Sequence, residues 1–128
     1  MLLGATALVA LSVVPSSGAA VRWFLSPHAG LDQVGCEVAS KRPRLGTYAE
    51  CQTARPQRAM TLHANGVSHI CRGLQCVGNS PTNATVLAYG HSVRVGPFRC
   101  TSLRAGIRCV VTASGHGFLI GPSAFKRF

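Results

Sequence analysis

Acidic side chains are scarce in this sequence, which holds three carboxylates, Asp32, Glu37 and Glu50, among its 128 residues. All three lie within the first 50 positions, so any reaction that needs a pair of carboxylates has to draw on them. Glu37 and Glu50 stand beside Cys36 and Cys51, where we expect them to face solvent across a hairpin. The scarcity of acids therefore argues against a glycosidase.

Aromatic residues and catalytic motifs are few as well. Aromatic side chains make up 6% of the chain, which argues against the stacking platform of a single-stranded nucleic-acid binder. The sequence has no G-x-S-x-G nucleophile motif, and its even number of cysteines leaves no free thiol for a Cys-His mechanism. We therefore expect a protein that is not an enzyme, needs no cofactor and does not bind nucleic acid.

The first twenty residues contain no ionisable side chain. An apolar run at positions 2–14 is followed by Pro15 and by small residues up to Ala20, as in a secretory signal peptide and its cleavage site. The run is shorter than the roughly 20 residues that span a bilayer, and no later stretch is long and apolar enough. We therefore expect a signal peptide at residues 1–20 and a secreted protein, or one associated with the cell wall, that begins at Val21.

Six cysteines follow this leader, and their even number in an oxidising compartment predicts three disulfides. They are Cys36, Cys51, Cys71, Cys76, Cys100 and Cys109. A zinc site is disfavoured because Cys71 and Cys76 have no second cysteine pair at matching spacing. Residues 21–128 can build only a small hydrophobic core, so we expect a single domain stabilised by these disulfides.

Short alternating segments separated by glycine, proline and asparagine fill residues 21–128, and no window has a helical period. The expected strands are Arg22–Leu25, Val34–Val38, Thr47–Cys51, Ala59–His63, Val67–Cys71, Val86–Tyr89, Ser92–Val95, Phe98–Thr101, Ile107–Thr112 and Gly117–Ile120. Because no strand-helix-strand pattern is present, the expected fold class is all-β, a small antiparallel, hairpin-rich sheet or a partly open barrel. Asn65 and Gly66 favour a two-residue type I′ turn, which would place Leu62 opposite His69.

The segment around the last two cysteines allows a strand register to be predicted. If residues 103–106 form the loop, Ser102 opposes Ile107, and Cys100 lies opposite Cys109 at a distance that a disulfide can span. Nearness in the sequence favours the other two pairs among the several connectivities that six cysteines allow. The expected disulfides are Cys36–Cys51, Cys71–Cys76 and Cys100–Cys109.

The run LAYGHSVRVGPFRCTSLRAGIRCVVTASGHGFLI, Leu87 to Ile120, resembles the C-terminal half of a family of uncharacterised secreted actinobacterial proteins, in which the pattern LxYG, GxFxCxS, GxxC and GHGF recurs. The pieces FLSPHAGLDQVGCEV and HICRGLQCVGN upstream are similar to the opening and the central cysteine segment of that family. The resemblance implies an extracellular or cell-envelope setting and supplies no activity.

Positive charge is what the sequence has in excess, since 13 Lys and Arg against three acids give a formal net charge of +10. Eleven of the thirteen are arginine, the side chain that binds phosphates and carboxylates in bidentate fashion. In the expected strands Arg94, Arg99 and Arg108 leave one face of a sheet, and Arg104 lies in the loop. We expect this face to bind an anionic polymer or surface; the alternative is an ordinary solvated face.

His116 lies between Gly115 and Gly117, which lets the backbone approach a ligand closely and leaves the imidazole available to it. The alternative is a turn in which the glycines supply unusual φ values and the histidine is packed or solvated. His63 and His69 can reach one another across their hairpin, but two histidines make only part of a metal site. We therefore expect no bound metal.

Together these features predict a secreted or envelope-associated domain that is not an enzyme. It would bind anionic wall polymers or lipid headgroups through its arginines, with His116 as a further candidate contact. The alternative is a disulfide-stabilised ligand or inhibitor that inserts an exposed loop, such as the one between Cys71 and Cys76, into a protein partner. The sequence leaves the oligomeric state open.

Overall fold

The structure is a computed structural model that describes residue 4 and residues 18–128. Most of the predicted signal peptide, at positions 1–3 and 5–17, lies outside the described residues. Within the described part of the chain, no helix is long and apolar enough to cross a membrane.

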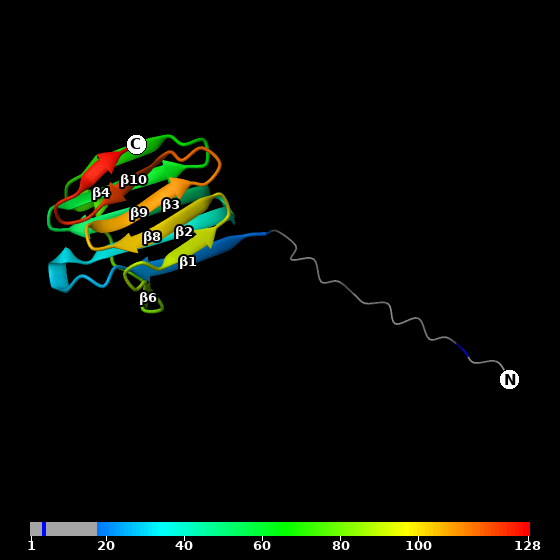
Figure 1. Cartoon of the computed structure of the whole chain (residues 1–128), viewed down its shortest axis with the longest axis horizontal. Coiled ribbons are helices and arrows are strands. Elements are labelled where there is room, and N and C mark those ends of the chain that lie inside the picture. The colour runs from blue at the N-terminus through cyan, green and yellow to red at the C-terminus, as the bar shows by residue number, and fades with distance from the viewer. Residues whose placement is uncertain (1–3, 5–17) are drawn as a thin grey trace.

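Eleven strands in the described residues form two sheets (Figure 1). The six-stranded sheet has the order β5-β4-β3-β2-β1-β6 and consists of β1 (Ala20–Leu25), β2 (Val34–Arg42), β3 (Gly46–Ala54), β4 (Gln57–His63), β5 (Ser68–Arg72) and β6 (Thr85–Val86). The five-stranded sheet has the order β11-β10-β9-β8-β7 and consists of β7 (Ser92–Val95), β8 (Phe98–Leu103), β9 (Gly106–Val111), β10 (Gly117–Ile120) and β11 (Phe125–Arg127). Two short 3₁₀ helices, η1 (Gly30–Asp32) and η2 (Leu74–Cys76), lie in the connections.

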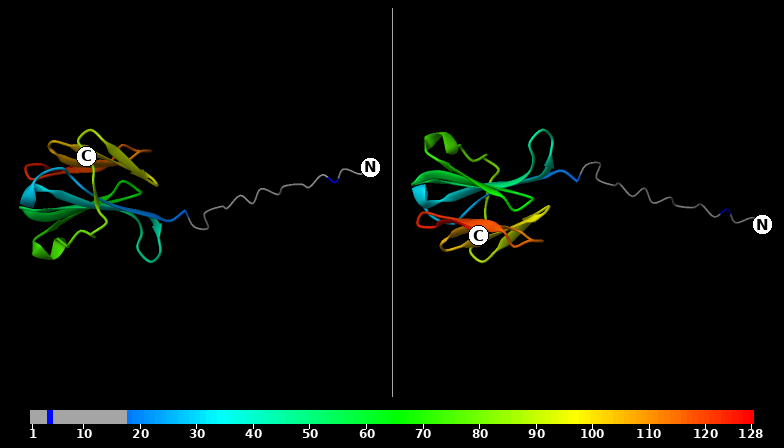
Figure 2. Two further views of the ribbon diagram at one scale, coloured as in Figure 1. Left: turned by 90° about the horizontal axis from the view of Figure 1, so that it is seen from below. Right: turned by 90° about the horizontal axis from the view of Figure 1, so that it is seen from above.

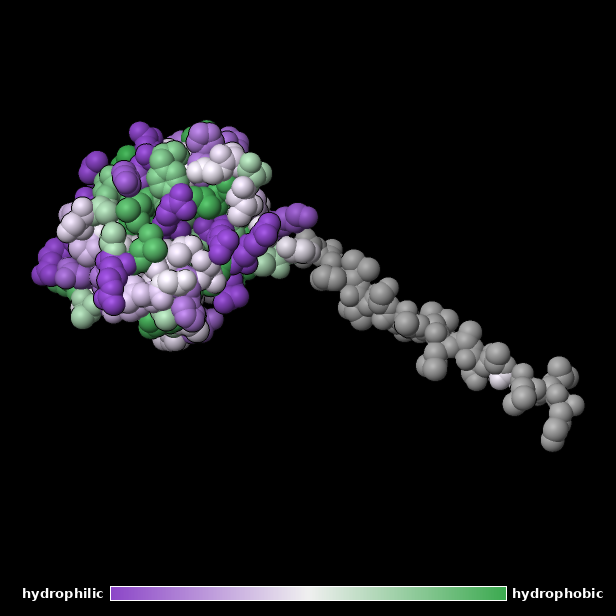
Figure 3. All heavy atoms as spheres, in the orientation of Figure 1, coloured by the Kyte–Doolittle hydropathy of each residue, from purple (hydrophilic) through white to green (hydrophobic). Residues whose placement is uncertain are grey.

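The two sheets pack face to face as separate layers (Figure 2). All strand pairs except one are antiparallel, and the exception is the short parallel pair of β1 and β6. The predicted all-β, hairpin-rich fold is confirmed, and the strands form two layers that do not close into a barrel. The layers leave two outer sheet faces, and Figure 3 views the molecule from the side of the five-stranded sheet.

The facing sides of the sheets bury one hydrophobic core. Alternation along the strands produces it, as in β8, where Phe98, Cys100 and Ser102 are buried and Arg99 is exposed. A strand directs successive side chains to opposite faces, so this pattern sends apolar groups inward and polar groups outward. The bulkiest side chains in the core are Phe24, Phe98, Phe118, Met60 and Leu62.

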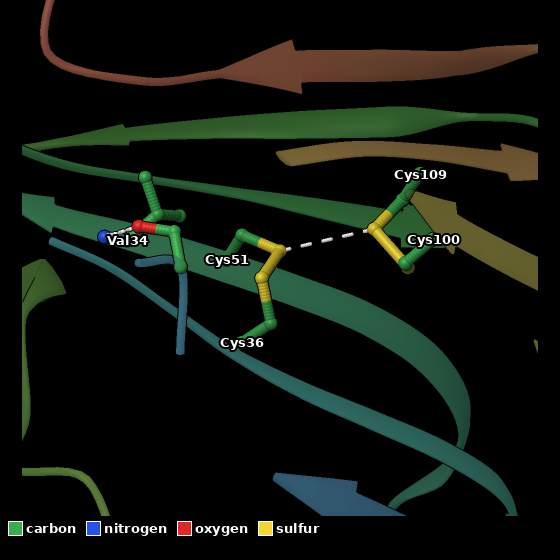
Figure 4. The surroundings of a disulfide bond; sticks show 6 residues. Val34, Cys36, Cys51, Cys100 and Cys109 are labelled. Carbon is green, nitrogen blue, oxygen red and sulfur yellow. Dashed lines mark hydrogen bonds between the residues drawn. A yellow bond between two sulfur atoms is a disulfide. The ribbon is translucent and has the colours of Figure 1, made fainter. Parts of the chain in front are cut away.

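Two of the three disulfides lie at the centre of this core (Figure 4). Cys36 lies directly opposite Cys51 and Cys100 directly opposite Cys109, each pair with Cα atoms 4.1 Å apart. The Sγ atoms of Cys51 and Cys109 are 3.8 Å apart across the two layers. Neither sulfur carries a proton, so this is van der Waals packing between the disulfides. The third bond, Cys71–Cys76, joins β5 to η2, and all three predicted pairs are confirmed.

The turn between β4 and β5 corrects the predicted register. Leu62 pairs with Ser68, not with His69. The loop has three residues, 64–66, because Gly66 takes a positive φ of 88° after the first two turn residues. A three-residue hairpin loop of this kind ends in a left-handed residue and shifts the pairing by one position relative to a type I′ turn.

Strand ends also differ from the prediction, in both directions. The expected strand Val86–Tyr89 contributes only β6, Thr85–Val86, which pairs with the edge of β1. By contrast β11, Phe125–Arg127, is not among the expected strands. It forms because β10 presents a free edge against which this segment can pair.

Candidate functional site

The arginines of the five-stranded sheet lie on its outer face. Arg94 pairs directly with Arg99 across β7 and β8, and Thr101, two residues along β8, pairs with Arg108 of β9. Directly paired residues and residues two apart on one strand point to the same side of a sheet. The structure therefore brings Arg94, Arg99 and Arg108 to one side, and all three are exposed.

Lys126 extends this cationic row, and its place there depends on β11, a strand that is not among those expected from the sequence. Arg108 pairs with Leu119 of β10, and Leu119 pairs with Lys126 of β11. The guanidinium of Arg108 lies 4.7 Å from the centre of the Phe128 ring, a cation–π contact that restrains the side chain. The four residues Arg94, Arg99, Arg108 and Lys126 are called the basic face below.

No acidic side chain neutralises the basic face. Glu37 lies on β2, Glu50 on β3 and Asp32 in η1, all in or beside the other sheet. The two ion pairs among the described residues, Arg42 with Glu37 and Arg55 with Asp32, also belong to that half of the molecule. Like charges directly opposite one another on a sheet repel, so the pair Arg94 and Arg99 leaves a positive potential that an anion would relieve.

A hollow of about 390 Å³ lies beside this arginine pair. Its lining consists of Ser92, Val93, Arg94, Arg99 and Thr112. The hydroxyl oxygens of Ser92 and Thr101 are 2.7 Å apart on the same face. Guanidinium and hydroxyl groups both donate hydrogen bonds, which phosphate oxygens accept. In Figure 3 this side of the molecule has hydrophilic residues spread among apolar ones.

Arg104 and His116, the other two predicted contacts, lie in the connections between β8, β9 and β10, and both are exposed. Arg104 follows β8 and its guanidinium lies 4.9 Å from the centre of the Tyr89 ring, while its carbonyl oxygen is 2.6 Å from Nε2 of His28. His116 lies beside the β4–β5 turn of the other sheet: a Cβ built on Gly66 would lie 3.1 Å from the Cβ of His116. Arg104 thus contacts residues that lead from the six-stranded sheet, and His116 lies beside the β4–β5 turn with its side chain exposed.

A second cationic cluster, which the sequence did not indicate, joins the two sheets at one edge. Arg58 and Arg72 pair across β4 and β5, and their guanidinium groups lie 4.3 and 4.9 Å from the centre of the Phe125 ring. Burial, together with the charge of Arg72, lowers the pKa of Arg58 below its ordinary value. Nη2 of Arg58 donates to the carbonyl oxygen of Gly121 at 3.0 Å. This cluster is explained by its structural contacts.

A cavity of about 550 Å³ lies on the outer face of the six-stranded sheet. Its lining includes Trp23, Glu37, Arg42 and Glu50. The two glutamates pair directly across the β2–β3 hairpin, on the outer face of the sheet, and both are half-exposed. This pairing follows from the disulfide. Because Cys36 lies opposite Cys51 in antiparallel strands, the residue after Cys36, Glu37, lies opposite the residue before Cys51, Glu50.

Metal-binding geometry is not found in the part of the chain that the structure describes, where no group of three or more His, Cys, Asp or Glu side chains converges. The His63 and His69 rings do meet, with centroids 5.1 Å apart. They form an edge-on pair without a third ligand.

Comparisons of the chain with models of protein families, with curated proteins and with solved structures found no match.

Proposed function

We propose that this protein is a secreted, non-enzymatic domain that adsorbs to a phosphate-bearing anionic surface through the basic face. The observation that carries the proposal is the direct pairing of Arg94 with Arg99, without any acidic side chain on that sheet. The strands fix the spacing of these groups before any ligand arrives, which lowers the entropic cost of binding. A row of cations on one face of a sheet suits a repeating polymer or a layer of lipid headgroups.

The three disulfides indicate an oxidising, extracellular environment. Secretion itself is part of the proposal. It is supported by the uncharged apolar segment at residues 1–20 and by the resemblance of Leu87 to Ile120 to secreted actinobacterial proteins. Surfaces outside a cell carry phosphodiesters both in wall polymers and in lipid headgroups, so either source offers the same chemistry to an arginine.

The test replaces Arg94, Arg99 and Arg108 together by Gln. Each basic residue near an anionic membrane contributes about 1 kcal/mol, so the triple variant should bind phosphatidylglycerol vesicles about 100-fold more weakly at low salt. A second arm uses a soluble poly(glycerol phosphate) polymer, which distinguishes a wall source from a lipid source. Binding of the unaltered protein should weaken steeply with added salt in whichever arm is correct.

A matched control removes the same charge from the other sheet. Arg22, Lys41 and Arg44 are exposed and lie on or beside β1 and β2, so their replacement by Gln lowers the net charge equally. Adsorption that depends on the basic face is retained in this control and lost in the first variant. Equal loss in both variants, or no loss in either, would show that the paired arginines have no special role.

The alternative of a ligand or inhibitor is supported by one observation at the Cys71–Cys76 loop. Leu74 at the start of η2 is 69% exposed, and the disulfide holds the loop in a fixed shape. A preorganised apolar side chain of this kind is the usual anchor of a protein contact. Binding through Leu74 would tolerate salt and would be lost in Leu74→Ser, which distinguishes it from adsorption by the basic face.

A further inference from the structure

We propose that the cavity on the outer face of the six-stranded sheet is a binding site for a neutral carbohydrate. This face lies on the opposite side of the two layers from the basic face (Figure 2). The proposal therefore does not depend on the proposed function, and either can fail without the other.

The floor of the cavity is a row of side chains on three adjacent strands. Trp23 of β1 pairs with Glu37 of β2, and Glu37 pairs with Glu50 of β3. Side chains paired in this way share one face, with Cβ atoms about 4.5–5.5 Å apart. An aromatic ring and two carboxylates are thereby set side by side on rigid strands.

The wall of the cavity is the segment after the Cys71–Cys76 disulfide, and it is fastened to the floor. Gln52 of β3 accepts a hydrogen bond from the backbone N–H of Gly78 at 3.0 Å and donates one to the carbonyl oxygen of the same residue. Ser80 lies against Gly35 of β2, where an added Cβ would come within 3.1 Å of the serine Oγ. These contacts hold the wall in place without a ligand, so the cavity is preformed.

Hydrogen bonds and an ion pair also orient the charged groups of the floor. Arg42 is paired with Glu37, and its Nη1 donates to the Tyr48 hydroxyl at 2.6 Å. Its guanidinium lies 5.9 Å from the centre of the Trp23 ring. Glu50 accepts a hydrogen bond from Thr61 Oγ1 at 3.1 Å and forms no ion pair with the described residues. One carboxylate therefore keeps its acceptor capacity for a ligand.

The balance of donors and acceptors favours a neutral polyol over an ion. Two carboxylates and one guanidinium make the floor slightly negative on a protein of net charge +10, which disfavours an anion. The donors Arg42, Gln75 and Asn79 line the same space, which disfavours a simple cation. A sugar hydroxyl both donates and accepts, and so needs such a mixed lining. The half-buried indole of Trp23 adds an apolar surface for the C–H groups of a sugar ring.

The volume agrees with this ligand class. Small-molecule sites typically enclose about 300–1,000 Å³ and combine a few convergent polar groups with an aromatic wall. The cavity has about 550 Å³, and it is open along one side of the sheet, as a site for part of an oligosaccharide requires.

Trp23 is the single tryptophan of the chain, so its fluorescence reports on this cavity alone. The test titrates the folded protein with maltotriose, cellotriose and the trimer of N-acetylglucosamine. Spermidine and inorganic phosphate, at matched ionic strength, serve as the cationic and anionic probes. We expect a saturable change in Trp23 emission with at least one neutral trisaccharide and none with either ion.

Glu50→Gln keeps the size of the side chain and removes its charge, and it should weaken binding of the active trisaccharide at least tenfold. Asp32→Asn is the matched control, since it makes the same charge change at η1, outside the cavity. The proposal is overturned if no trisaccharide changes the emission, if spermidine or phosphate does so in their place, or if the two variants bind the trisaccharide equally.

Discussion

Breaking Cys100–Cys109 is expected to cost the protein clearly more stability than breaking Cys71–Cys76. The two bonds close short loops of similar size, with sequence separations of 9 and 5. Loop-closure entropy alone then gives about 2.7 and about 2.2 kcal/mol, a difference too small to separate them. Their surroundings decide the rest, because the first bond lies in the core and the second at the surface.

The buried bond carries an additional packing term. Cys100 and Cys109 are fully buried, and Sγ of Cys109 touches Sγ of Cys51 in the opposite sheet. Replacing both residues by Ala leaves a void between the layers, at a further cost of about 1–2 kcal/mol. Cys71 is exposed and Cys76 half-buried, so their replacement leaves no comparable void. The expected totals are about 4 and about 2 kcal/mol.

Thermal unfolding followed by circular dichroism measures the difference. At about 4 °C per kcal/mol for a domain of this size, C100A/C109A should lower Tm by about 16 °C and C71A/C76A by about 8 °C. Neither variant has a free thiol from its broken pair, and neither changes the net charge. Equal shifts, or a larger shift for C71A/C76A, would refute the inference that contact between the two buried disulfides stabilises the core.

Two further predictions concern single positions. Gly117→Ala should prevent or severely impair folding, because a Cβ there would collide with the carbonyl oxygen of Cys109, whereas Gly78→Ala, which meets no atom within 4 Å, should leave Tm unchanged. Burial raises the pKa of Tyr48 above its ordinary value of 10.0, although the hydrogen bond from Arg42 lowers it in part. The corresponding stability is fully present below pH 10 and is lost as pH rises through the raised pKa, so Tyr48→Phe should flatten the decline in urea-unfolding free energy above pH 10.

Local sequence patterns were sufficient to predict the strand register where both strands belong to one hairpin. The alternation from Phe98 to Cys109 indicated which side chains share a face, and the pairing of Cys100 with Cys109 followed. Leu103 and Gly106, which were expected in the loop, form the last pair of the ladder, so the turn is shorter than predicted while the register is unchanged. The β4–β5 hairpin shows the limit of that reasoning. The dipeptide Asn65–Gly66 indicated a turn correctly, but the same dipeptide can form a two-residue type I′ loop or can end a three-residue loop with a left-handed glycine. The strand pairing shows which of the two loops forms.

Contacts between segments far apart in the sequence could not be predicted from local sequence patterns. β11 has little strand propensity and forms because β10 offers it unpaired backbone groups. The distribution of strands between two layers depends on which sheet faces cover one another, and that is a property of the assembled core. For the same reason the sequence could place three arginines on one face, whereas Lys126 joined them only through β11.

The amino-acid sequence by itself determined the all-β class, the three disulfides and the positive charge, because alternation, cysteine spacing and composition act over short distances or over the whole chain. Only the tertiary structure decided that Trp23, Glu37 and Glu50 share the floor of a cavity, and that the segment after Cys76 covers it. A strand fixes the side to which each residue points, but its neighbours are chosen by the packing of the whole sheet.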